Sequence, residues 1–197
     1  MEQTTNIEEQ ERISRIVGFI NTGDRKSAAA GYAFFVKRYS QKVLDFVSRM
    51  TDNLADAEDL AQNAFIKAFS HVQSFEGRAT FLSWVCRIAY NETITHLKRK
   101  KLNFISIDDT QIYDTEISDD EFSTGKEERI QELEAAIDLL NPDEKMLVHL
   151  YYYEDKPLKE IAFIMNTEPN TLAVRLHRIR RKLAEIVNKN RAASLRL

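Results

Sequence analysis

The sequence is poor in the residues that build disulfide frameworks, strands and membrane spans. Its 197 residues include one cysteine, Cys86, together with five glycines and three prolines. A single thiol forms no disulfide framework, which favours a reducing cytoplasm, and the apolar stretch around Cys86 predicts a core position. No apolar run approaches the roughly 18 residues of a membrane-spanning helix, and the polar N-terminus is unlike a signal peptide. We therefore expect a cytoplasmic protein without membrane insertion.

Signatures of catalysis and metal binding are missing as well. The four histidines are scattered along the chain without the spacing of metal ligands. There is no phosphate-binding glycine loop, no GxSxG sequence and no dinucleotide fingerprint. These absences predict a protein with no metal, no cofactor and no catalytic residues, so that its function lies in binding.

Helical periodicity dominates what is present. Scarce glycine and proline, and the lack of alternating Val, Ile and Thr residues, favour an all-α fold of two small helical domains. In the first part of the chain, apolar residues recur every three and four positions along residues 31–50, 51–72 and 81–101. The pattern breaks near Asn53 and again around Gly77, where we expect a turn and a loop.

All three prolines fall in the last third, each beside a predicted helix start. Asn141, Asp155 and Thr167 are the expected N-caps, and Asn166 is expected to end a helix in the left-handed conformation. The predicted helices cover about residues 127–140, 142–154, 156–165 and 168–189. The last two are separated only by Asn166 and Thr167, which is helix-turn-helix spacing.

The last predicted helix has two distinct faces. Its apolar stripe comprises Leu172, Leu176, Ile179, Leu183 and Ile186. The candidate DNA-binding residues on its other side are Asn170, Thr171, Ala173, Val174, His177, Arg178, Arg181 and Lys182. Arg178 is the candidate for a bidentate contact to guanine, whereas Arg181, Lys182 and Lys189 should lie beside phosphates. Arg175, at the edge of the stripe, is expected to pair with Glu160.

Charge is distributed unevenly along the chain, although the net charge is only −3. Residues 98–101 are all basic, and the end of the chain from residue 171 is also rich in Lys and Arg. Between these regions, residues 102–125 carry acids and no Lys or Arg. This segment reads as a flexible acidic linker, which we expect to shield the two basic regions from DNA in the free protein.

In this order, the features resemble a bacterial sigma factor of the extracytoplasmic-function (ECF) class. The resemblance is carried by three stretches: "DAEDLAQNAFIKAF", "SFEGRATFLSWVCRIAYNETITHLKRKK" and "LNPDEKMLVHLYYYEDKPLKEIAFIMNTEPNTLAVRLHRIRRKL". They are similar, respectively, to the segment that docks on polymerase, the segment that captures the minus-ten element, and region four, which reads the minus-thirty-five element. The chain departs from the family pattern at Asn63, which changes one expected polymerase contact, and at Ala173 and Val174, so the promoter sequence cannot be transferred.

The resemblance implies a division of the chain and roles for its residues. It predicts an N-terminal extension (1–29), a region-two domain (30–101), a linker (102–126), a region-four domain (127–190) and a tail (191–197). The implied polymerase-binding residues are Asp56, Asp59, Gln62 and Asn63. The implied minus-ten and phosphate contacts are Ser74, Arg78, Lys98, Arg99, Lys100 and Lys101. The implied partners are core RNA polymerase and promoter DNA, and whether an anti-sigma factor also binds is left open.

Two other functions remain open on sequence grounds. A stand-alone helix-turn-helix regulator would have a similar terminal domain but would bind operator DNA without polymerase. An all-helical adaptor would have no role on DNA, and its basic faces would simply be solvated.

Overall fold

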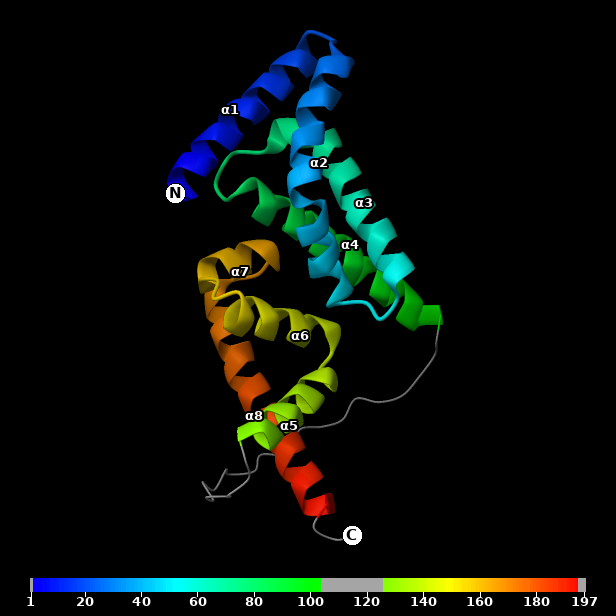
Figure 1. Cartoon of the computed structure of the whole chain (residues 1–197), viewed down its shortest axis with the longest axis vertical. Coiled ribbons are helices and arrows are strands. Elements are labelled where there is room, and N and C mark those ends of the chain that lie inside the picture. The colour runs from blue at the N-terminus through cyan, green and yellow to red at the C-terminus, as the bar shows by residue number, and fades with distance from the viewer. Residues whose placement is uncertain (1, 104–125, 195–197) are drawn as a thin grey trace.

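The computed structural model describes residues 2–103 and 126–194, and in these ranges the chain is helical without a strand. The first domain comprises α1 (Glu2–Asn21), α2 (Arg25–Ser48), α3 (Leu54–Ser70), a 3-10 turn (Val72–Ser74) and α4 (Phe81–Asn103). The second comprises α5 (Lys126–Asp138), α6 (Pro142–Val148), a π-helical turn (His149–Tyr153), α7 (Leu158–Ile164) and α8 (Pro169–Ser194). The all-α, two-domain prediction is confirmed (Figure 1).

Aromatic packing holds α2, α3 and α4 together. Phe35 and Phe81 are fully buried, with ring centroids 4.2 Å apart, and Tyr32 meets Phe81 edge to face. The buried Tyr32 hydroxyl donates to the Phe65 backbone carbonyl at 2.9 Å, so the polar end of this ring is satisfied inside the core. The stripes predicted along residues 31–50, 51–72 and 81–101 supply these contacts.

Helix α1 lies in the segment predicted as an N-terminal extension, and it packs along α2. Ile13 and Ile16 are buried against the first domain. Glu9 is only 4% exposed, and its carboxylate accepts a hydrogen bond from the Tyr39 hydroxyl. The extension therefore contributes to the hydrophobic core of the first domain. Its polar composition concealed the few apolar residues that make these contacts.

The second domain is built around the apolar stripe of α8. Leu172, Leu176 and Ile179 are buried, and Leu183 packs against the same cluster, which confirms the predicted stripe as far as Leu183; Ile186 is half-buried. Helices α5, α6 and α7 all contact α8. The apolar stripe of α8 is thus the surface against which α5, α6 and α7 pack.

The expected turn residues have mixed outcomes. Asn141 is the N-cap of α6 and forms a capping box with Glu144, and Asn166 has a φ of 52°; both predictions are confirmed. Asp155 is not an N-cap: it has a φ of 49°, and Pro157 occupies the N-cap position of α7. Thr167 is likewise not adjacent to α8, because Glu168 comes between them.

The two domains pack against each other through α4 and α7 (Figure 1). Their buried apolar residues form a single continuous cluster that includes Phe81 and Val85 from the first domain and Leu150 and Ile164 from the second. The predicted acidic linker, 104–125, lies outside the described residues. The closeness of the two domains was not anticipated from the sequence.

The capping box at the start of α6 gives a first prediction. Asn141 Oδ1 accepts the Glu144 backbone N–H at 2.9 Å, so Asn141→Ala should lower the free energy of unfolding by about 1 kcal/mol. Asn141→Asp keeps the acceptor and should retain most of that stability. Urea unfolding followed by circular dichroism measures both variants, and equal stability of the alanine variant and the unmodified chain would contradict the capping role.

Candidate nucleic-acid interface

Helix α8 presents a continuous exposed face beside its buried stripe. Asn170, Thr171, Ala173, Val174, His177 and Arg178 are all exposed. Val174 is 53% exposed although it is apolar, which fits a surface that contacts a partner. Because the hydrophobic stripe fixes the rotation of α8 about its axis, these side chains project together from the first half of the helix.

A short turn sets the angle between α7 and α8. Helix α7 has seven residues and a C-cap at Met165, and the left-handed Asn166 follows. The Thr167 N–H donates to the Ala162 carbonyl at 3.0 Å, which closes the end of α7, and α8 begins at Pro169. The geometry is that of a helix-turn-helix with an exposed second helix.

Farther along α8, several basic side chains are held by groups of the same chain. Lys182 donates to Glu144 at 2.8 Å, and Arg180 donates to the Tyr152 hydroxyl at 2.7 Å. Arg181 is half-buried, whereas Lys189 is exposed. Arg178 and Lys182 therefore differ: Arg178 is exposed, whereas Lys182 must break its contact with Glu144 before it can bind a phosphate.

The predicted pair between Glu160 and Arg175 is wrong. Arg175 pairs with Asp143 at the start of α6, and Glu160 pairs with Lys156 at 2.7 Å. Glu160 also accepts a hydrogen bond from Ser83 of the first domain at 2.8 Å. Sequence spacing placed the two charged groups near the same turn, but the position of α6 and the contact with α4 determine their partners.

The loop between α3 and α4 contains a second candidate site. Ser74, Gly77, Arg78, Trp84 and Arg87 line a hollow of about 300 Å³ together with neighbouring loop residues. Gly77 has a φ of 71°, which favours glycine at the point where the loop turns back. The Ser74 hydroxyl donates to the His71 carbonyl at 2.7 Å.

Helix α1 contacts this loop, and the charged side chains at the tip of the loop are exposed to solvent. Gln10 contacts the Gly77 carbonyl at 3.4 Å, which connects α1 to the loop. Arg78 pairs with Glu76 at 2.5 Å, and both side chains are more than half exposed. Hydrogen bonds therefore hold the loop that lines the hollow, and the exposed Arg78 side chain is accessible to a ligand.

The basic end of α4 is solvent-facing, as expected for phosphate contacts. Lys98, Arg99 and Lys100 are exposed, and the side chain of Lys101 lies outside the described residues. Lys100 donates to Asp56 on α3 at 3.2 Å. This hydrogen bond lowers the pKa of the Asp56 carboxyl, so Asp56 is a partner of Lys100 within the domain.

Helix α3 carries the remaining candidate residues. Asp59, Gln62 and Asn63 are exposed, unlike the ion-paired Asp56. Gln62 also lines an apolar groove of about 1000 Å³ between α2 and α3. Ile66, which is 63% exposed, lies in the same groove.

The sequence reasoning did not identify this groove. Its apolar walls include Val36, Leu44 and Phe65. The available signal was Ile66, because it lies off the stripe that runs through Ala57, Leu60, Ala61 and Ala64. Because Ile66 lies in one groove with Val36, Leu44 and Phe65, the exposed apolar surface is contiguous, and a contiguous patch indicates a binding surface.

Within the described ranges, other kinds of site are not found. No group of three or more His, Cys, Asp or Glu residues is placed to hold a metal ion there. Among the same residues, no helix combines the length and the apolar character that crossing a bilayer requires. Cys86 is buried, and burial raises the pKa of its thiol to about 12, so it is a poor nucleophile.

Comparison with known proteins gives two family matches, one in each domain. Residues 35–102 match the model for sigma-70 region 2, and residues 130–183 match the model for sigma-70 region 4. The chain is 30% identical over 174 residues to the ECF RNA polymerase sigma-E factor of Escherichia coli K12, covering 84% of this chain and 88% of the relative. It is 29% identical over 175 residues to the ECF RNA polymerase sigma factor SigW of Bacillus subtilis, covering 81% and 90%.

A solved structure supports the fold. The sigma factor RpoE of Bartonella quintana, described in complex with the anti-sigma factor NepR, superposes with a TM-score of 0.57. The match is 20% identical and covers 80% of this chain and 96% of that protein. At this identity the likeness concerns the helical fold.

Proposed function

The chain belongs to the ECF sigma factors of the sigma-70 family, which act in promoter recognition and transcription initiation, and we propose that its two domains divide this task. The first domain docks on core RNA polymerase and captures an unstacked base of the minus-ten element. The second domain reads the minus-thirty-five element through α8.

The observation that carries the proposal is the two-faced character of α8. One face is fixed in the core by Leu172 and Leu176, and the other exposes Asn170 and Arg178. A major groove admits such a helix, and an exposed arginine can bind guanine through two hydrogen bonds. Ala173 and Val174 offer methyl contacts suited to thymine, without hydrogen bonds.

The minus-ten function is assigned to the hollow in the loop before α4. A base removed from the stack needs a site that stacks on it and donates hydrogen bonds. Around this hollow Trp84 offers an aromatic ring and Arg78 offers hydrogen-bond donors, while the Ser74 hydroxyl, which donates to the His71 carbonyl, can still accept a hydrogen bond. Lys98 and Arg99, exposed on α4, are placed for contact with duplex phosphates, where each contact adds a salt-dependent contribution.

The groove between α2 and α3 is the proposed polymerase-binding surface. An apolar groove with polar groups on its rim suits an amphipathic helix of a partner. Ile66 and Phe65 supply the apolar contact, while Asp59 and Gln62 present an acid and an amide beside it. The acid favours a basic partner surface, and Asn63 extends the polar rim.

Two broader assignments follow from this role. We propose that the chain works in the cytoplasm and catalyses no reaction itself, because it contributes binding surfaces to the catalytic polymerase. The sigma factor RpoE was solved with an anti-sigma factor bound, which supports a protein inhibitor as a further partner of this chain.

Charge reversal on α3 tests polymerase docking. Asp59→Arg should weaken binding to core RNA polymerase at least tenfold, a loss of about 1.4 kcal/mol, because it places like charge against a basic surface. Titration with labelled protein measures the affinity. Glu11→Arg is the matched control, since Glu11 is an exposed α1 acid in a surface pair, and it should bind normally. Equal affinity of the two variants would exclude this docking surface.

A second test concerns base reading by α8. Arg178→Ala should relax sequence preference at one or two minus-thirty-five positions, with a loss of about 1–3 kcal/mol of discrimination against the wrong base. Promoter selection profiles with the holoenzyme at two salt concentrations measure the effect. Lys189→Ala is the control and should weaken binding to all promoter sequences equally. If Lys189 contacts one phosphate, the variant should reduce the slope of log affinity against log salt concentration by about 0.9.

The same profiles distinguish the alternative functions. Uniform weakening by Arg178→Ala would make Arg178 a phosphate contact and move base reading to its neighbours on α8. A stand-alone regulator would show full sequence preference without polymerase, and an adaptor would show no salt-dependent binding to DNA at all.

A further inference from the structure

The loop before α4 lies beside helix α1 and is attached to it at two points (Figure 1). Gln73 donates to the side chain of Asn21, the last residue of α1, at 2.9 Å. Gln10, in the middle of α1, donates to the Gly77 carbonyl at 3.4 Å. The two contact points are about 16 Å apart along the helix axis at about 1.5 Å per residue. Helix α1 therefore holds the loop near its start and again at the turn.

The contact between Gln10 and Gly77 is also a close steric fit. Gly77 has a φ of 71°, which disfavours any residue with a side chain. A Cβ atom at this position would lie 2.5 Å from Nε2 of Gln10, which is closer than non-bonded atoms can approach. The amide of Gln10 therefore covers the backbone of the loop at the point where the loop turns back.

The core of the first domain fixes the position of Gln10. Glu9, Ile13 and Ile16 are all buried, and their spacing places them on one face of α1. The Tyr39 hydroxyl donates to the Glu9 carboxylate, which sets how far α1 extends along α2. Gln10 follows Glu9 directly and is exposed, so the buried contacts determine where its amide meets the loop.

The residues between the two attachment points form the minus-ten hollow. Phe75 packs on α4, with its ring centroid 5.2 Å from that of Trp84. Ser74, Phe75 and Trp84 all line the hollow, together with Gly77 and Arg78. Movement of the loop away from α1 would therefore displace the groups that are proposed to receive an unstacked base.

Holding this loop has a consequence for binding. A ligand that must order a mobile loop loses affinity to the entropy of ordering, whereas a preorganised loop avoids this cost. Gln10, Asn21 and Gln73 are exposed, so their removal leaves the core of the domain intact. Their hydrogen bonds act on the position of the loop.

We propose that α1 is a positioning element for base capture, in which Gln10 and Asn21 hold the loop before α4 in the conformation that receives an unstacked minus-ten base. Both are positioning residues and act through Gly77 and Gln73. This inference deepens the proposed function and rests on the assignment of the minus-ten base to this hollow.

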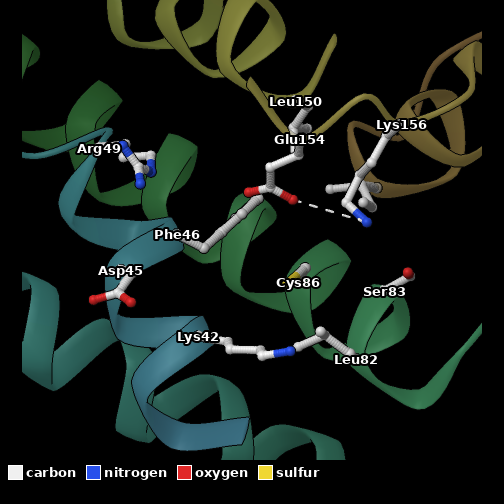
Figure 2. Close-up of a pocket in the computed structure, with 11 residues that line it drawn as sticks. Lys42, Asp45, Phe46, Arg49, Leu82, Ser83, Cys86, Leu150, Glu154 and Lys156 are labelled. Carbon is white, nitrogen blue, oxygen red and sulfur yellow. Dashed lines mark ion pairs between the residues drawn. The ribbon is translucent and has the colours of Figure 1, made fainter. Parts of the chain in front are cut away.

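Trp84 reports the position of the loop in the full chain without polymerase or DNA. It is the single tryptophan of the sequence, and it lines the hollow. Leu82, Ser83 and Cys86 of the same helix line a different cleft, of about 340 Å³, between the two domains (Figure 2). Quenching of Trp84 fluorescence by acrylamide therefore measures access through the loop.

The first arm of the test measures this quenching. Gln10→Ala and Asn21→Ala should each increase the Stern–Volmer constant of acrylamide, and the double variant should increase it further. Ser14→Ala is the matched control, because Ser14 is another exposed residue of α1, and its constant should equal that of the unmodified chain. Equal constants in the double variant and the control would overturn the proposal.

The second arm measures base capture by the holoenzyme. The probes are fork-junction duplexes whose minus-ten segment is single-stranded and randomised, and the selected sequence is then made with an abasic site at each position in turn. The position where the abasic site costs most affinity identifies the captured base. Binding to that abasic probe does not use the hollow, so the affinity ratio between the intact and the abasic probe measures capture alone.

This affinity ratio should fall in the α1 variants. We expect a fall of about threefold in Gln10→Ala, the effect of losing one hydrogen bond between neutral groups. The double variant should lose about tenfold, because contacts at well-separated points are additive. Affinity for core polymerase, affinity for the abasic probe and the urea midpoint of the free chain should match those of Ser14→Ala.

A purely structural role for α1 gives a different result. It would lower the urea midpoint and weaken binding to the intact and abasic probes by the same factor, which would overturn the proposal. An unchanged affinity ratio in the double variant would also overturn it. A lower ratio without a change in Trp84 quenching would exclude the route through the loop.

Arg78→Ala, tested on the same probes, separates this inference from the proposed function. An unchanged ratio in Arg78→Ala and in the double variant alike would reject the hollow as the base-capture site, and the quenching result would still stand. A lower ratio in Arg78→Ala, with an unchanged ratio in Gln10→Ala and Asn21→Ala, would reject the role of α1 alone.

Discussion

Helix α4 is packed on two sides, and this constraint connects the other features of the molecule. Phe81, Val85 and Ala89 recur every four residues and are fully buried, so they fix the rotation of α4 in the first domain. That rotation directs Ser83 and Arg87 toward the second domain. The loop that forms the minus-ten hollow ends where α4 begins, so the two proposed DNA-reading elements are held by one helix.

Charge pairing limits how many basic side chains of this protein, whose net charge is −3, are free to attract a polyanion. Lys182 is paired with Glu144, and Lys100 with Asp56. Such partly exposed pairs are weak because solvent screens them, so a phosphate can replace the acid at little cost. Arg178 is exposed on α8, which suits a residue that selects sequence.

Local sequence patterns predicted the helices and their ends, whereas they did not predict contacts between segments that are distant in the sequence. The stripe of α8, the N-cap at Asn141 and the left-handed Asn166 all follow from spacing and residue type. The partner of Glu160 does not follow from local patterns, because Ser83 lies 77 positions away in the sequence and contacts Glu160 only through the packing of the two domains. Helix α1 was missed for a related reason: its few apolar residues, such as Ile16, are meaningful only against α2.

The accessibility of the surfaces implies an order of events. With the two domains packed together, the groove on α3 and the face of α8 that includes Arg178 are exposed. The hollow at Arg78 is bordered by Phe163 of the second domain. The groove that is proposed to bind polymerase is lined by residues of α2 and α3 alone, so docking there does not require the two domains to separate.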